Sequence, residues 1–102
     1  MANFVVRTGD TLSTGHGCVG TTTLGGDNQD GTVHANGIDI AVKGAPTVSH
    51  AFPPEPPCAP HVAQLNVGSS TVWINGIEVG RIDDSADAGQ MTTGSPDVTA
   101  GP

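Results

Sequence analysis

Apolar and polar residues alternate along two short stretches of the chain, residues 33–40 and 72–79, and Asn-Gly interrupts each alternation. An apolar residue at every second position predicts a strand with one apolar face. Asn-Gly between two such strands is the strongest short-range signal for a β-hairpin, because both turn residues must adopt positive φ. We therefore expect two β-hairpins, each with one apolar and one mixed face.

The two predicted hairpins are copies of one repeated unit. Residues 32–40 and 71–79 share five of nine positions, and Asp/Glu and Ile/Val exchanges raise the number of similar positions to seven. Two fragments near the termini match the flanks of the second copy: residues 94–98 resemble its lead-in, and residues 7–10 resemble its exit. We expect about three units, the third of them split across the two ends of the chain.

Two connectors separate these units. Residues 14–31 are rich in Gly, Thr and Asp and predict a loop. Residues 50–61 contain five prolines, which exclude a central strand and favour an extended excursion. No window of ten residues has helical periodicity. The sequence predicts a single all-β domain over residues 1–102, built from short hairpins.

Composition adds that this domain needs support beyond a conventional core. Apolar residues make up 35% of the 102 positions, with one Trp, two Phe and no Tyr. A small domain with so few large side chains usually relies on a metal, a disulfide or a partner protein. We expect at least one of these here.

Charge excludes several functions. Three Lys and Arg against ten Asp and Glu give a formal net charge of −7. Nucleic-acid binding and charge-driven binding to anionic membranes both need a basic patch, which three scattered residues do not make. The N-terminus has no signal-peptide pattern, and no run approaches the ~18 apolar residues of a transmembrane helix. We expect a soluble protein that something else carries if it leaves the cell.

Histidine and cysteine are the residues that could carry chemistry. His16 lies in the first connector, while His50, Cys58 and His61 lie in or beside the proline-rich one. Imidazole and thiolate are the usual ligands of zinc, and Cys58 and His61 are spaced closely enough for one turn to aim both at one ion. Four protein ligands would close the site, which indicates a structural metal and argues against an enzyme.

Other interpretations of these residues stay open. Cys18 is an alternative ligand, or it forms a disulfide with Cys58 of the kind found in exported domains. His34 is also an alternative ligand, but we expect it to pair across the hairpin with Asp39. The acids among residues 83–89 are expected to be solvated and to offer no ligand. No Gly-x-Ser-x-Gly motif is present.

The pattern Gly-Ser-x-x-Val-x-x-Asn-Gly, followed by a strand and Arg-x-(Gly/Asp)-Asp, resembles the repeat of the PAAR family. It is best matched at residues 68–84, with parts of it at residues 7–10 and 94–98. The resemblance implies a conical β-structure with pseudo-threefold repeats, closed near its vertex by a metal ion, zinc or alternatively iron. The family's ligands are three histidines and one cysteine. By position these would be His16, His50, Cys58 and His61.

The resemblance also implies a function. PAAR proteins are the spike tips of type VI secretion systems and contractile phage tails. The chain would be a monomer that caps one trimeric β-helical spike protein, sharpens it and meets the target's outer membrane mechanically. It would be located at a virion tail tip or be secreted through a contractile injection system. The alternatives are a small exported disulfide-bonded binding module and a zinc-dependent hydrolase.

Overall fold

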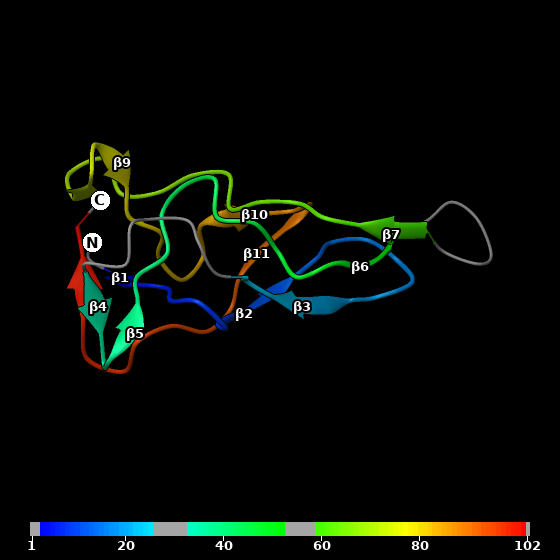
Figure 1. Ribbon diagram of the computed structural model, residues 1–102, viewed down its shortest axis with the longest axis horizontal. Coiled ribbons are helices and arrows are strands. Elements are labelled where there is room, and N and C mark those ends of the chain that lie inside the picture. The colour runs from blue at the N-terminus through cyan, green and yellow to red at the C-terminus, as the bar shows by residue number, and fades with distance from the viewer. Residues whose placement is uncertain (1–2, 26–32, 53–58, 102) are drawn as a thin grey trace.

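The computed structural model describes residues 3–25, 33–52 and 59–101, and every regular element within them is a β-strand (Figure 1). The predicted all-β fold is confirmed. The described residues contain no helix long and apolar enough to cross a membrane. The strands are β1 (Asn3–Phe4), β2 (Thr11–Ser13), β3 (Thr21–Thr23), β4 (His34–Ala35), β5 (Ile38–Asp39), β6 (His50–Phe52), β7 (Ala59–His61), β8 (Trp73–Ile74), β9 (Ile77–Glu78), β10 (Ser85–Ala86), β11 (Gly89–Met91) and β12 (Thr99–Ala100).

Three antiparallel strand pairs form one end of the molecule: the hairpins β4–β5 and β8–β9, and the pair β1–β12, which has no connecting turn but is counted with the hairpins below. The first two are the predicted copies, and their Asn and Gly turn residues have φ between 53° and 79°. The third pairs the two ends of the chain, with Asn3 opposite Ala100. The expected unit split across the termini is therefore present. The predicted cross-strand pair of His34 and Asp39 is also confirmed, at 2.8 Å.

The molecule tapers away from these hairpins. Its extents are 41 × 27 × 22 Å, and the ribbon runs from the hairpin end through the sheet β10-β11-β2-β3 to the pair β6–β7 (Figure 1). The strands in the proline-rich segment pair only with each other among the described strands, so they form no central strand, as expected. We call the hairpin end the broad end and the β6–β7 end the narrow end.

A closed ring of backbone hydrogen bonds joins the three units. The Val6 N–H donates to the Gly80 carbonyl, Gly80 to Ala41, and Ala41 back to Val6, at 2.9–3.0 Å. A Cβ on Gly80 would overlap the Leu65 side chain, so glycine permits the closest approach here. The ring places one residue of each unit around a pseudo-threefold axis.

Each unit then turns through one residue with positive φ. Gly9, Gly44 and Asp83 have φ of 88°, 91° and 76°. Their N–H groups donate to the carbonyls of three fully buried residues, Leu24, Leu65 and Met91. The same turn and the same contact recur in every unit, which explains how so few large side chains fill the core.

The three units differ in the side chains that brace this turn. Two carry a mostly buried arginine–aspartate ion pair, and the third has two fully buried apolar residues at the same positions. The pairs are, in chain order, Arg7–Asp10, Val42–Ala45 and Arg81–Asp84. In all three the later residue's N–H donates to the carbonyl of the earlier one, so the backbone geometry does not depend on the ion pair.

Candidate metal centre

Three arms of unequal length extend from the ring toward the narrow end. Counted from equivalent paired residues, they span residues 11–23, 46–64 and 85–90. The shortest arm ends in a turn at Asp87, where φ is +53°. The longer arms continue past it, and they carry His16, His50 and His61.

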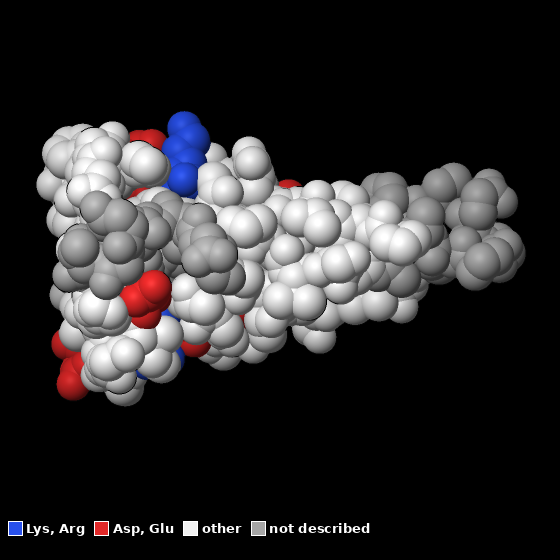
Figure 2. All heavy atoms as spheres, in the orientation of Figure 1, with Lys and Arg blue, Asp and Glu red and all other residues white. Residues whose placement is uncertain are grey.

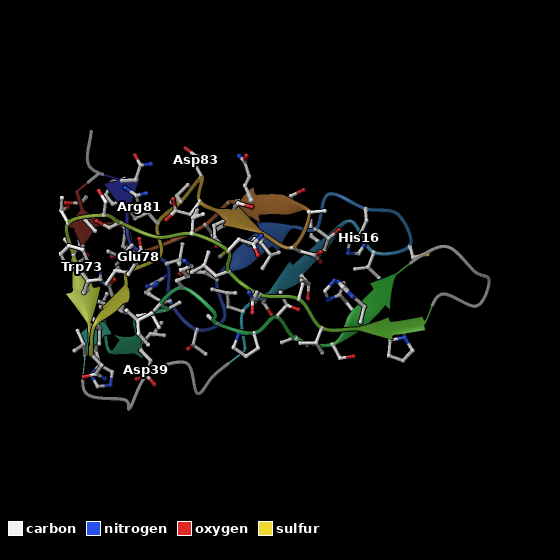
Figure 3. All side chains as sticks on the ribbon, turned by 90° about the horizontal axis from the view of Figure 1, so that it is seen from above. His16, Asp39, Trp73, Glu78, Arg81 and Asp83 are labelled. Carbon is white, nitrogen blue, oxygen red and sulfur yellow. The ribbon has the colours of Figure 1, made fainter. Side chains whose placement is uncertain are left out.

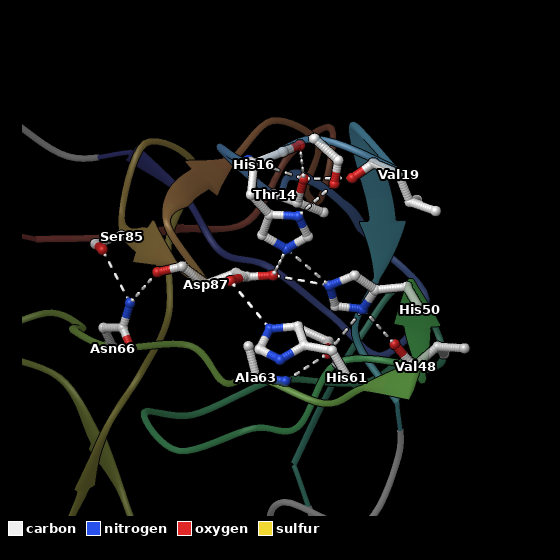
Figure 4. A network of polar contacts seen from close by, with 12 residues as sticks. Thr14, His16, Val19, Val48, His50, His61, Ala63, Asn66, Ser85 and Asp87 are labelled. Carbon is white, nitrogen blue, oxygen red and sulfur yellow. Dashed lines mark hydrogen bonds and ion pairs between the residues drawn. The ribbon is translucent and has the colours of Figure 1, made fainter. Parts of the chain in front are cut away.

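These three histidines and Asp87 form one cluster (Figure 4). Each offers a ligand atom, and the four atoms lie within 4.8 Å of one another. The Nε2 atoms of His16 and His50 both lie 2.8 Å from Asp87 Oδ2, and His61 Nε2 lies 3.3 Å from Oδ1. The rings of His16 and His50 are nearly parallel, with that of His61 perpendicular to both.

Backbone carbonyls orient two of the rings. His50 Nδ1 lies 2.8 Å from the Val48 carbonyl, and His16 Nδ1 lies 2.9 Å from the Gly17 carbonyl. A carbonyl only accepts, so Nδ1 of each ring carries a proton, and Nε2, which faces Asp87, is left to hold either a second proton or a metal ion. This is how proteins usually hold metal-binding histidines.

The arrangement could hold a cation. With the Nδ1 protons committed, His16 Nε2, His50 Nε2 and the Asp87 carboxylate would meet as acceptors at 2.8–3.2 Å. Acceptors this close repel one another unless a proton or a metal ion lies between them. The donor set therefore fits a bound metal, with excess protons as the only other way to balance it.

The cluster is largely shielded from water. The side chains of His16, His50 and Asp87 are 7%, 3% and 5% exposed, and that of His61 is 26% exposed. The Gly17 carbonyl and, opposed by burial, Asp87 raise the pKa of His16. Burial alone would raise the pKa of Asp87, but hydrogen bonds from the three histidines outweigh it and lower that pKa.

The structure brings together three of the four residues that the sequence pointed to: His16, His50 and His61. Cys58 lies outside the described residues. Cys18 is bonded in a disulfide, and the sequence has one other cysteine, Cys58. His34, the other alternative, pairs with Asp39 at the broad end, away from His16 (Figure 3).

Asp87 is the residue that the sequence analysis missed. The acids of residues 83–89 were expected to be solvated, which is wrong for Asp84 and Asp87, and to offer no ligand, whereas Asp87 could offer one. The Asp87 side chain is 5% exposed inside the histidine cluster, and that of Asp84 is 8% exposed against Arg81. A signal was present in the repeat. Once the units are aligned, the third arm is the shortest, so its turn ends beside the two longer arms and not beyond them.

The sequence matches no known family model, and a search of curated proteins finds no relative. What the chain itself establishes is an all-β fold with pseudo-threefold units. It also has a group of three histidines and one aspartate that could hold a metal ion.

Proposed function

We propose that this chain is the structural tip of a contractile injection machine, a phage tail or a type VI secretion system. It would cap the blunt end of a trimeric β-helical spike. The observation that carries the proposal is the broad end, where one chain presents three equivalent hairpins around an axis. A homotrimer ends in a threefold face, and a single chain meets such a face evenly only if it repeats itself three times.

The side chains of the broad end support this interpretation. Large apolar side chains stand exposed on its hairpins, among them Phe4 at 41%, Trp73 at 53% and Ile77 at 39%. Apolar groups gathered on one face favour a protein partner. The blunt end of a β-helix exposes unpaired strand ends, which also need a cover. The two faces would protect each other.

The distribution of charge supports passage of the narrow end through a membrane. In the view of Figure 2 the charged side chains gather toward the broad end. The three basic residues Arg7, Lys43 and Arg81 all pair with groups of the turns and hairpins there. Among the described residues of the cluster at the narrow end, the one acid is the shielded Asp87. A surface with few charges is less costly to move into a membrane. Glu55, between β6 and β7 in the sequence, lies outside the described residues.

The metal would be a structural zinc ion held by His16, His50, His61 and Asp87. Three imidazoles and one carboxylate suit zinc, and iron is the alternative that the same donors would accept. Asp87 would supply the fourth ligand, the role that the family resemblance gives to Cys58. With four protein ligands no position is reserved for a water, so we propose support of the narrow end and no catalysis.

Mixing the purified chain with trimeric β-helical spike proteins tests the proposal. Native mass spectrometry should find one copy of this chain per trimer. Trp73→Asp should abolish the complex, and Val62→Asp should not, because Val62 is comparably exposed at 58% but lies on the narrow arm. Equal loss in both variants, or no 1:3 complex with the unaltered chain, would contradict the proposal.

A second function is favoured by one observation, the disulfide at Cys18. Disulfides are typical of exported domains, so the chain could be a small secreted binding module. That interpretation predicts that the metal is dispensable and that reduction unfolds the chain. Measuring unfolding with a reductant alone and with a chelator alone separates the two: the tip proposal requires the larger loss with the chelator.

A further inference from the structure

A hollow of about 360 Å³ opens at the broad end between the three hairpins. Two layers of its wall contain one residue from each unit. The deeper layer is buried, with exposed fractions of 1–6%, and consists of Val5, Ile40 and Val79. The layer nearer the mouth is more exposed and consists of Val33, Val72 and Val98.

The two layers are held together identically in the three units. The Val5 N–H donates to the Val98 carbonyl at 2.9 Å, and the pairs Ile40–Val33 and Val79–Val72 repeat this bond at 3.1 and 3.0 Å. Each deeper residue also directly precedes a member of the hydrogen-bonded ring. The hollow therefore lies on the pseudo-threefold axis, and these two layers of its wall are threefold in chemistry as well as in position. The rest of the lining comes from two of the units: Trp73, Ile74, Asn75, Thr99 and Ala100.

We propose that this hollow receives three identical aliphatic side chains, one from each chain of a trimeric partner, gathered on the partner's threefold axis. The inference rests on the proposed function and names the contact that aligns the two axes. A threefold axis brings copies of one side chain together, which no asymmetric partner does. Three equivalent walls then contact three equivalent groups.

The size and polarity of the hollow set the chemistry of these side chains. A cavity of about 150 Å³ holds one benzene molecule, so roughly twice that volume accommodates the ends of three leucine-sized groups. The six valine and isoleucine side chains are apolar, and the N–H groups of the deeper layer already donate within the wall. Within these two layers a polar plug would lose its water without gaining partners, because the polar lining residues Asn75 and Thr99 are exposed.

Charged side chains on the hairpins are paired, and the axis is the apolar contact that all three units share. Asp39 and Glu78 are the partly exposed acids of the second strands of two hairpins, paired with His34 and Lys43. Groups at a rim contribute little to affinity compared with apolar groups seated in a central pocket. We expect the axial side chains to determine whether the trimer binds.

The test uses two designed trimeric β-helices that differ only at their blunt end, with one leucine per chain on the axis or one serine. Titration calorimetry should give a Kd at least about tenfold lower for the leucine trimer, as for a central hot spot. On this chain, Val72→Phe fills the hollow and should weaken binding by about tenfold or more, whereas Val62→Phe on the narrow arm should not.

The outcomes separate the inference from the function on which it rests. If neither trimer binds, both the proposed capping function and the proposed insertion of three axial side chains (the plug) are contradicted. Equal binding of both trimers, with Val72→Phe unaffected, overturns the plug and leaves the cap standing. Self-association of the chain that the leucine trimer does not displace also overturns it. The leucine–serine comparison uses the unaltered chain, so it decides the question even if Val72→Phe does not fold.

Discussion

The two ends of this molecule are stabilised by opposite means. At the broad end three nearly equal hairpins surround a common axis, and apolar side chains hold them together. At the narrow end three unequal arms meet at buried polar side chains that could hold a metal ion between them. Where the units repeat, symmetry lets small residues pack closely. Where the units differ in length, equivalent side chains no longer meet, and a single polar cluster joins the arms instead.

Removing the proposed metal should affect the narrow end most, and it is the largest effect that we expect. A chelator should lower the free energy of unfolding by roughly 3–6 kcal/mol, less than the ~10 kcal/mol of domains that zinc folds outright, because the apolar end remains. Denaturant titration with and without the chelator measures this loss. His50→Ala should abolish the response, and His34→Ala at the broad end should retain it.

A chelator effect that does not depend on the histidine cluster would contradict the proposed difference between the two ends. If the chelator destabilises the His50→Ala variant as strongly as the unaltered chain, the cluster holds no metal. If the chain binds no metal at all, the negative charge of Asp87 is balanced by protons on the histidines instead.

The next largest effect concerns the ion pairs that brace two of the three turns. Asp84→Ala removes the carboxylate that binds the Arg81 guanidinium and accepts from the Arg81 backbone N–H. The side chains of Arg81 and Asp84 are both over 85% shielded from water. We expect a loss of about 3 kcal/mol, at the lower end for a buried pair because some water remains.

The unit with Val42 and Ala45 supplies the matched comparison. The double variant Arg81→Val, Asp84→Ala copies its apolar pair, so it should be more stable than Asp84→Ala alone. A denaturant midpoint for each variant completes the cycle. A double variant less stable than the single one would show that the three turns are not interchangeable.

Gly80→Ala probes the centre of the ring, where the broad end packs most closely. The added methyl group would overlap the Leu65 side chain and lie 2.8 Å from Val6 Cγ2. We expect a loss of about 2 kcal/mol from overpacking, read from thermal unfolding. Gly20→Ala is the control, since its Cβ would meet nothing within 4 Å and its φ is not positive. Equal losses would mean that the ring does not limit packing.

The same contrast explains what the sequence could predict. The hairpins follow from local chemistry, because Asn-Gly requires positive φ wherever it stands, as at Asn36 and Asn75. The split third hairpin followed from the repeat, although its strands β1 and β12 are only two residues each. The first two hairpins follow from neighbouring residues, and the third follows from comparing its two halves with the complete copies.

The histidine–aspartate cluster depends on the lengths of three arms, which no single segment contains. The histidines stood out because they are few in a chain with little other chemistry. Asp87 did not, because it is one of ten acids and its burial arises only when His16 and His50 close over it. Sequence patterns locate strands well, but they do not predict how deeply a turn is buried.

The smallest expected effect is a pH dependence whose direction differs with and without metal. Asp87 has a lowered pKa, so its contribution to stability is present above its ordinary value of 3.8 and is lost as pH falls through the lowered one. His16 has a raised pKa, so its contribution is present below 6.5 and is lost as pH rises through the raised one. The free energy of unfolding of the metal-free chain should therefore be largest between pH 3.8 and pH 6.5, and it should decrease at higher and at lower pH.

With metal the slope above pH 6.5 should reverse, because protons compete with the ion for the same nitrogen atoms and their loss strengthens binding. Trp73, the only tryptophan, lies at the broad end, so its fluorescence during denaturant unfolding reports whether the whole molecule follows the cluster. Asp87→Asn removes the carboxylate while nearly keeping its shape, and should flatten the metal-free profile. Identical slopes with and without metal would mean that the cluster does not couple to folding, and that the apolar end alone determines stability.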